Sequence, residues 1–211
     1  MPIVAAKCGT SELSPLAVTL ATVKREPKTA GTLWRFPHFH YTGDKMRFFN
    51  IKDDYIAFLR QYDSLVQENK NERRPYVGVV LEIGDVRYFA PFTSPKRKHA
   101  SMKNGKDFRK IAGGKYGAIN FNNMIPVCDE ALLPIDFVTV TDPQYRRLLQ
   151  NQYKAIKNDR EAIKKTACDL RMLYGTIDDD LGKYELSVKS RCCNFPLLES
   201  VYKNYTSTST I

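Results

Sequence analysis

The apolar positions from residue 46 onward follow two periods, one typical of strands and the other of helices. Residues 47–51 predict a short strand, and the apolar residues of 52–67 recur at helical spacing, which predicts an amphipathic helix. Residues 76–83 are rich in β-branched side chains and predict a buried strand. Gly84-Asp85 fits a two-residue turn, so residues 86–90 are expected to return as the partner strand of a hairpin.

Further strands are expected after this hairpin, and they complete a small sheet. They are predicted at 117–121, 124–127 and 135–140. Consecutive strands lack helical crossovers between them, which argues against a parallel βαβ array. Strands in the middle of the chain and helices toward both ends predict the α+β class with an antiparallel sheet.

The last third of the chain is expected to be helical. Asp142-Pro143 predicts a helix start, with an N-cap residue followed by proline at the first helical position. Asn158 and Glu161 fit a capping box for a second helix that runs to about residue 174. A final helix is predicted over 194–205, and residues 206–211 are expected to form a frayed tail.

Residues 1–45 differ from the rest, because they hold no long periodic segment and prolines interrupt them repeatedly. They also lack the plan of a signal peptide. Since the structured pattern begins at a second methionine, Met46, we expect the natural start there; a genuine but loosely ordered arm is the alternative. Residues 46–205 are then expected to form one domain.

The composition favours an acidic partner. Lys and Arg outnumber Asp and Glu by 33 to 23, which gives a net charge of +10. Nucleic acid is the commonest acidic partner of proteins with such a charge. The five cysteines form no CxxC pair and their number is odd, which favours a reducing, cytoplasmic setting and small apolar roles for the thiols. No metal site, cofactor motif or stretch of eighteen apolar residues is visible.

The positive charge is densest in residues 93–115, which read as a loop of more than twenty residues. This segment has one acid, Asp107, and a loop of such length inside a domain is usually functional or disordered. Its eight basic residues are Lys96, Arg97, Lys98, Lys103, Lys106, Arg109, Lys110 and Lys115.

Thr93-Ser94-Pro95-Lys96 opens this segment at the end of a strand. Two hydroxyls, a stiffening proline and the cations that follow can hold a phosphate. RNA cleavage by the substrate's own 2′-hydroxyl needs only a base, a cation and a proton donor, and His99 is a candidate base. A solvated turn is the alternative interpretation. The chain has neither a Gly-x-Ser-x-Gly elbow nor a phosphate-binding Gly-x-x-x-x-Gly-Lys loop.

Five stretches resemble, in the same order, the toxins of type III toxin–antitoxin systems, the ToxN, AbiQ and CptN family. They are MRFFNIKDDYIAFLRQYD (46–63), VGVVLEIGDVRYFAPFTSPK (77–96), INFNNMIPV (119–127), YRRLL (145–149) and NFPLLESVY (194–202). The resemblance implies a partly open, strongly bent barrel similar to MazF and Kid, with flanking helices. It also implies metal-independent, sequence-selective RNA cleavage that leaves a 2′,3′-cyclic phosphate and a 5′-hydroxyl.

The resemblance also implies roles for particular residues. The family's Thr-Ser-x-Lys loop falls on Thr93, Ser94 and Lys96, which become candidate catalytic residues. The family's tyrosine in the first helix falls on Tyr55. Where the family has a lysine before the central strand, this chain has Arg74, which departs from the pattern and leaves the identity of a general base open.

Finally, the resemblance implies an inhibitor made of repeated RNA, expected to be a pseudoknot that the toxin processes and that closes with it into a ring. Cellular or phage RNA is the expected substrate, and the bacterial cytoplasm the expected location. The candidate RNA-binding residues are Arg74, Arg97, Lys98, His99, Lys103, Lys106, Arg109, Lys110, Asn120, Tyr145, Arg146 and Arg147. The alternative functions are a non-catalytic RNA-binding protein that uses the same basic groove and a DNA-binding regulator, although no helix-turn-helix is apparent.

Overall fold

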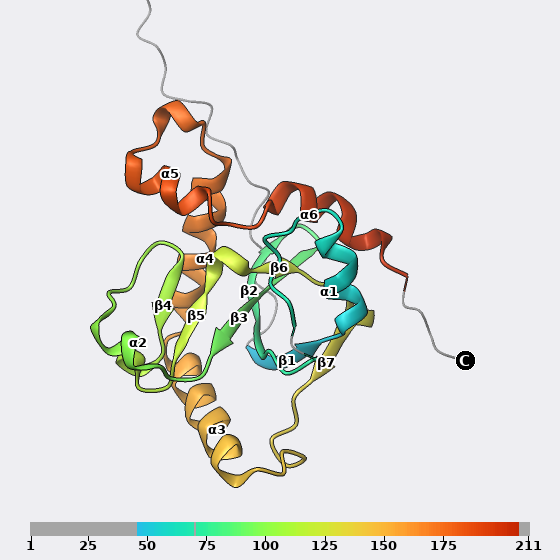
Figure 1. Cartoon of the computed structure of the whole chain (residues 1–211), viewed down its shortest axis with the longest axis vertical. Helices are drawn as coiled ribbons and strands as arrows, with labels where there is room; N and C mark the ends of the chain where they lie inside the picture. The colour runs from blue at the N-terminus through green and yellow to red at the C-terminus, as the bar shows by residue number, and fades with distance from the viewer. Residues whose placement is uncertain (1–45, 70, 207–211) are drawn as a thin grey trace, which may run out of the picture. The chain divides into compact units, whose positions relative to one another are not determined.

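A computed structural model describes residues 46–69 and 71–206 of the chain (Figure 1). The expectations about residues 1–45 and about 207–211 lie outside the described residues. Within them the fold is α+β, as predicted, and every strand pair is antiparallel. No helix among these residues is long and apolar enough to cross a membrane.

Seven strands of the described chain form one sheet in the order β4-β5-β3-β2-β1-β7, and β6 pairs with β3 beside β5. The two end strands, β4 and β7, do not pair with each other in this order, so the sheet is open. The strands are β1 Arg47–Ile51, β2 Tyr76–Ile83, β3 Val86–Thr93, β4 Phe108–Lys110, β5 Ala118–Asn120, β6 Ile125–Pro126 and β7 Leu132–Pro134.

The central hairpin of β2 and β3 is confirmed. Ile83 pairs with Val86, so Gly84 and Asp85 form the turn, and Gly84 has the positive φ of 56° that such turns favour. Strand β3 is longer than predicted and reaches Thr93, because its end pairs with β5 as well as lying beside β2. The predicted start of the sheet at β1 is also confirmed.

Six α-helices lie in the described residues, and short 3-10 turns link several elements. Figure 1 shows α3 and α4 following one another along the sheet, whereas α1 and α6 lie together at its other end. The helices are α1 Asp53–Arg60, α2 Arg97–Ser101, α3 Pro143–Asn158, α4 Arg160–Gly175, α5 Lys183–Lys189 and α6 Phe195–Val201. The 3-10 turns are η1 Ala112–Gly114, η2 Phe121–Asn123, η3 Asp129–Ala131, η4 Asp178–Asp180 and η5 Tyr202–Asn204.

The first helix is shorter than predicted. It ends at Arg60, and Tyr62 and Leu65 are 43% and 46% exposed instead of continuing its buried face. The buried carboxylate of Asp63 accepts hydrogen bonds from the backbone N–H groups of Leu65 (2.8 Å) and Asn194 (2.6 Å). These bonds stabilise a turn in place of further helix.

The strand predicted at 135–140 is wrong. The strand in this region is β7, which ends at Pro134, and Ile135 makes one last backbone bond to Phe48. The Asp136 carboxylate then accepts a hydrogen bond from the Val138 N–H at 2.9 Å, while its carbonyl accepts from Thr139. An aspartate that bonds its own backbone two residues on forms a turn and ends the strand.

The capping box predicted from Asn158 and Glu161 is also wrong. Helix α3 extends through Asn158, and the N-cap of α4 is Asp159, whose side chain does not cap the helix. The predicted start of α3 is confirmed, because the Asp142 carboxylate accepts from the N–H groups of Gln144 (2.8 Å) and Tyr145 (3.3 Å). Local spacing identifies a cap only when no tertiary partner competes for the side chain.

The sequence predicted one irregular loop over residues 93–115, and this prediction is wrong. These residues contain α2, β4 and the η1 turn, and β4 pairs with β5. The remaining exposed connection after β3 is therefore short, and it is the Ser94–Lys96 segment that carries the predicted chemistry. Ordered elements on both sides give this segment a defined geometry.

Candidate active site

The segment Ser94-Pro95-Lys96 leaves the sheet where β3 ends. Thr93, the last residue of β3, pairs with Ala118 of β5, and helix α2 begins directly after Lys96. The side chains of Ser94 and Lys96 are exposed, whereas residues 88–92 of β3 are buried. A hydroxyl and an ammonium group therefore face solvent from a short connection between two ordered elements.

Thr93 faces the protein interior. Its hydroxyl oxygen Oγ1 is buried and has no hydrogen-bond partner. Its carbonyl lies against Gly117, where an added β-carbon would come within 1.8 Å of the Thr93 oxygen and φ is +99°. Only glycine fits such an approach at this φ. The predicted catalytic hydroxyl of Thr93 is thus behind the exposed surface that Ser94 presents.

His99 supports the Ser94–Lys96 segment from inside. Its imidazole is 2% exposed and lies tilted against the Phe108 ring, with 5.9 Å between the ring centroids, and its Nδ1 accepts a hydrogen bond from the Lys96 backbone N–H at 3.2 Å. Burial, and then the charges of Lys96 and Lys98, lower the pKa of His99. A neutral imidazole that accepts at Nδ1 carries its proton on Nε2. This placement favours a supporting role over the expected RNA contact.

A group of the predicted basic residues is free for a ligand. None of them has an acidic partner in the described part of the chain, and all are exposed. We name them the open cations: Lys96, Arg97, Lys98, Lys103 and Arg147.

Other predicted RNA contacts already have protein partners. Lys106 pairs with Glu185 at 2.6 Å, and the Arg109 guanidinium makes two bonds to Asp159, at 2.5 and 2.6 Å. Arg146 donates to the Val140 carbonyl. Such paired groups have less to offer a phosphate than the open cations.

The last predicted RNA contacts in this region belong to the small β4–β5 pair. Lys110 ends β4, and its backbone N–H donates to the Asn104 side chain at 2.8 Å. Asn120 ends β5 and lies opposite Phe108. Both side chains are half-buried, so the structure places these two residues within the framework of the sheet.

Arg74 lies near the predicted loop. The Phe92 N–H donates to the Pro75 carbonyl at 3.0 Å, so the residue after Arg74 is bonded to the residue before Thr93. The Arg74 Nε donates to the Glu68 carbonyl at 2.9 Å, which leaves other guanidinium N–H groups for a ligand. The arginine that departs from the family pattern is therefore next to the candidate site.

The structure does not bring Tyr55 to this site. Its ring is fully buried beside Tyr205, and its hydroxyl donates to the Pro126 carbonyl at 2.7 Å. Burial raises the pKa of Tyr55 far above its ordinary value. These contacts favour a structural role. Tyr145, in the first turn of α3, is half-buried, and burial raises its pKa as well.

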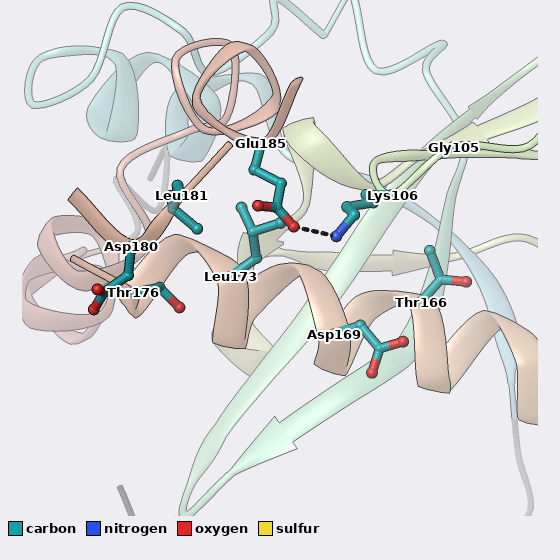
Figure 2. Close-up of a pocket in the computed structure, with 9 residues that line it drawn as sticks. All are labelled: Gly105, Lys106, Thr166, Asp169, Leu173, Thr176, Asp180, Leu181 and Glu185. Carbon is teal, nitrogen blue, oxygen red and sulfur yellow. Dashed lines mark hydrogen bonds and ion pairs between the residues drawn. The ribbon is translucent and has the colours of Figure 1, made fainter. Parts of the chain in front are cut away.

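Figure 2 shows the residues that line a separate cavity, whose volume is about 540 Å³. The cavity is lined by α4, α5 and the turn before β4, and the Lys106–Glu185 ion pair stands at its wall. None of its lining residues belongs to 93–99. This cavity holds none of the hydroxyl and lysine groups of the Ser94–Lys96 segment, and we take that exposed segment as the site.

Sequence reasoning missed Gln152, whose side-chain amide reaches the Thr93 and Tyr116 carbonyls from α3. A signal was present, since Gln152 shares the buried face of α3 with Leu149 and Ile156. A glutamine at an apolar position of an amphipathic helix indicates buried polar partners.

An exposed hydroxyl and an exposed lysine on a short segment, followed in the chain by the exposed cations Arg97 and Lys98, can hold a phosphate of the kind that nucleic acids carry. Residues 47–203 match the family model described as toxin ToxN of type III toxin–antitoxin systems. The chain therefore belongs to the ToxN toxin family. It is 32% identical over 168 residues to endoribonuclease ToxN of Bacillus thuringiensis subsp. kurstaki, covering 77% of this chain and 85% of that protein.

Two solved structures agree with this assignment. One, from work on selective toxin inhibition by a noncoding RNA pseudoknot in bacterial type III systems, has a TM-score of 0.66 and 31% identity and covers 75% of this chain and 96% of that chain. The other is AbiQ, a lactococcal anti-phage endoribonuclease of the same type of system. It has a TM-score of 0.62 and 30% identity, over 76% of this chain and 98% of that one.

Proposed function

We propose that this member of the ToxN family is a sequence-selective endoribonuclease that cleaves RNA without a metal ion. The observation that carries the proposal is the exposed pair of Ser94 and Lys96 on the short segment after β3. The endoribonuclease relatives support the activity. Lys96, with Arg97 and Lys98 next to it in the chain, supplies positive charge where a phosphodiester gains negative charge during cleavage.

The proposed reaction uses a nucleophile from the RNA. The ribose 2′-oxygen loses its proton to a base and attacks the adjacent phosphorus, and the bond from phosphorus to the 5′-oxygen breaks as that oxygen receives a proton. The products are a 2′,3′-cyclic phosphate and a 5′-hydroxyl. Lys96 and the Ser94 hydroxyl stabilise the phosphorane oxygens, and Arg74 adds charge from the neighbouring ladder. Neither Ser94 nor Lys96 attacks the substrate itself.

The proposal includes the partners that the relatives suggest. A repeated RNA, folded as a pseudoknot, is the proposed inhibitor, since a relative's structure concerns toxin inhibition by such an RNA. A ring of toxin and RNA, with cellular or phage RNA as substrate in the bacterial cytoplasm, completes it. A likeness of the open sheet to the MazF and Kid barrels stays a prediction.

Cleavage in the presence of EDTA tests this function. The chain from Met46, incubated with total bacterial RNA in excess EDTA, should cut this RNA at defined sites. The new 5′ ends should carry a free hydroxyl, so a polynucleotide kinase should add a phosphate to them directly. Ser94→Ala should lose most of this cleavage, whereas Ser64→Ala, at another exposed serine, should keep it. RNA that binds tightly and stays intact would instead support the alternative, a non-catalytic RNA-binding protein.

A further inference from the structure

Gln152 is a buried polar residue on a helix that otherwise packs through apolar side chains. It is 1% exposed, and it shares the inner face of α3 with Leu149 and Ile156. Burying a primary amide costs free energy unless its groups find partners. The hydrogen-bond partners of Gln152 therefore indicate which part of the structure its side chain stabilises.

The Gln152 amide nitrogen donates a short hydrogen bond to the Tyr116 carbonyl and makes a longer one to the Thr93 carbonyl. Nε2 lies 2.7 Å from the Tyr116 oxygen and 3.5 Å from the Thr93 oxygen. Because a primary amide has two N–H groups, one nitrogen can donate to both. Helix α3 thus holds together the residue that precedes Ser94 and the turn before β5.

Gly117 restrains the same Thr93 carbonyl from another direction. The close approach of Gly117 to this oxygen leaves no space for a β-carbon. The Thr93 side chain contributes no hydrogen bond, since its buried Oγ1 has no partner. The Thr93 backbone is paired with Ala118 at the end of the β3–β5 ladder, and its carbonyl also lies between Gln152 and Gly117, so these contacts together orient the Thr93–Ser94 peptide.

We propose that Gln152 is a positioning residue for RNA cleavage, because it helps to fix the peptide that joins Thr93 to Ser94. A peptide unit is planar and trans, so the direction of the Thr93 C=O also sets the direction of the Ser94 N–H and the start of the Ser94 side chain. Gln152 does not touch the RNA; it acts through Ser94. The inference rests on the proposed endoribonuclease function.

Two substitutions separate positioning from packing. Gln152→Leu keeps a side chain of similar size without a donor. Gln152→Glu donates only when its carboxyl is protonated, and burial beside two carbonyl oxygens raises the pKa of a carboxyl. Gln150→Leu and Gln150→Glu are matched controls, because Gln150 is an exposed glutamine on the same helix.

The experiment measures single-turnover cleavage of a synthetic RNA oligonucleotide spanning a site that the wild-type chain cuts. Binding is measured with the same oligonucleotide carrying a 2′-deoxyribose at the cleaved position, and thermal unfolding is followed at each pH. Gln152→Leu should cut about 10- to 100-fold more slowly, the scale of a small misplacement at a reacting centre. Its affinity for the deoxy oligonucleotide should stay within about twofold of wild type, as binding rests on the exposed cations.

The pH profile gives the decisive comparison. The rate of Gln152→Glu relative to wild type should rise as pH falls from 8 to 5.5, after correction for the folded fraction, whereas the Gln150 variants should show a constant ratio. A constant ratio for Gln152→Glu, or an unchanged cleavage rate in folded Gln152→Leu, would overturn the positioning role while leaving the endoribonuclease proposal intact. If the wild-type chain cuts no RNA, both proposals fail.

Discussion

The two halves of the basic segment 93–115 are similar in sequence and different in structure. From Lys96 to Lys103 the cations are exposed and lack acidic partners in the described chain. From residue 106 onward, Lys106 and Arg109 pair with acids from α5 and from the α3–α4 junction, and Asp107 pairs with Arg191 at 2.6 Å. Lys110 and Lys115 of this half have no acidic partner in the described chain, and Lys115 lies over the ring of Tyr116. Charge density in a sequence therefore does not distinguish cations that hold the fold from cations that are free for a ligand.

The largest expected difference between the halves is in catalysis. Lys96→Ala should lower the single-turnover RNA cleavage rate about 100-fold or more, the usual effect of removing a group that stabilises transition-state charge. Lys106→Ala should keep the rate within about threefold, since its ammonium is held by Glu185. If both variants lost the same fraction of the cleavage rate on one oligonucleotide, the exposed and the paired cations would not differ in catalysis, and the comparison would be wrong.

The next difference concerns the salt dependence of RNA binding. Removing Arg97, Lys98 and Lys103 together should weaken binding at every sequence. Each lost phosphate contact should reduce the slope of log affinity against log salt by about 0.7, the value for single strands. Filter binding between 50 and 300 mM salt measures this slope. An unchanged slope would mean that these exposed cations do not contact the backbone.

A smaller effect is expected on stability in the second half. Arg109→Ala removes a two-bond ion pair with Asp159, whose side chains are 22% and 38% exposed. Unfolding by urea should show a loss of about 1 kcal/mol, the upper range for partly exposed pairs. Arg97→Ala is the matched control and should leave the free energy of unfolding unchanged; a loss as large as that of Arg109→Ala would contradict the comparison.

The smallest effect is a pH dependence of the first half. The folded state lowers the pKa of His99 below its ordinary 6.5 by burial. The neutral imidazole therefore stabilises the fold above pH 6.5, and this contribution is lost as the pH falls below 6.5 through the folded pKa. His99→Asn keeps an acceptor without a titration, so its stability should fall less than that of wild type between pH 7 and 5 in urea unfolding. Parallel curves for the two proteins would refute this.

Local patterns in the sequence were sufficient where neighbouring residues determine the structure. The β2–β3 hairpin and the start of α3 are set by a glycine turn and by an aspartate cap, and both predictions are confirmed. The strand predicted at 135–140 failed because one side chain, Asp136, turns the backbone. The capping box failed because Asp159, and not Asn158, begins α4.

The candidate site divides in the same way. The segment from Thr93 to Lys96 was identified because its residue types lie next to one another in the chain. Gln152 was not, because it reaches Thr93 from 59 residues away, and such a contact exists only after the sheet and α3 have packed. The ion pair of Arg109 could not be predicted for the same reason, since its partner Asp159 is 50 residues away in the chain.

An ion pair between Arg171 of α4 and Glu199 of α6 joins residues close to the end of the domain to its centre. Glu199 accepts from Arg171 at 2.8 Å twice and from the Tyr88 hydroxyl at 2.6 Å, and it follows Tyr88 by 111 residues. During translation the hairpin forms early, but Arg171 stays without this carboxylate until the ribosome has passed residue 199. Since a poorly solvated arginine without its partner is costly, nascent chains that stop earlier should be unable to fold. We therefore expect the fold to become complete only when residues as late as Glu199 have been made.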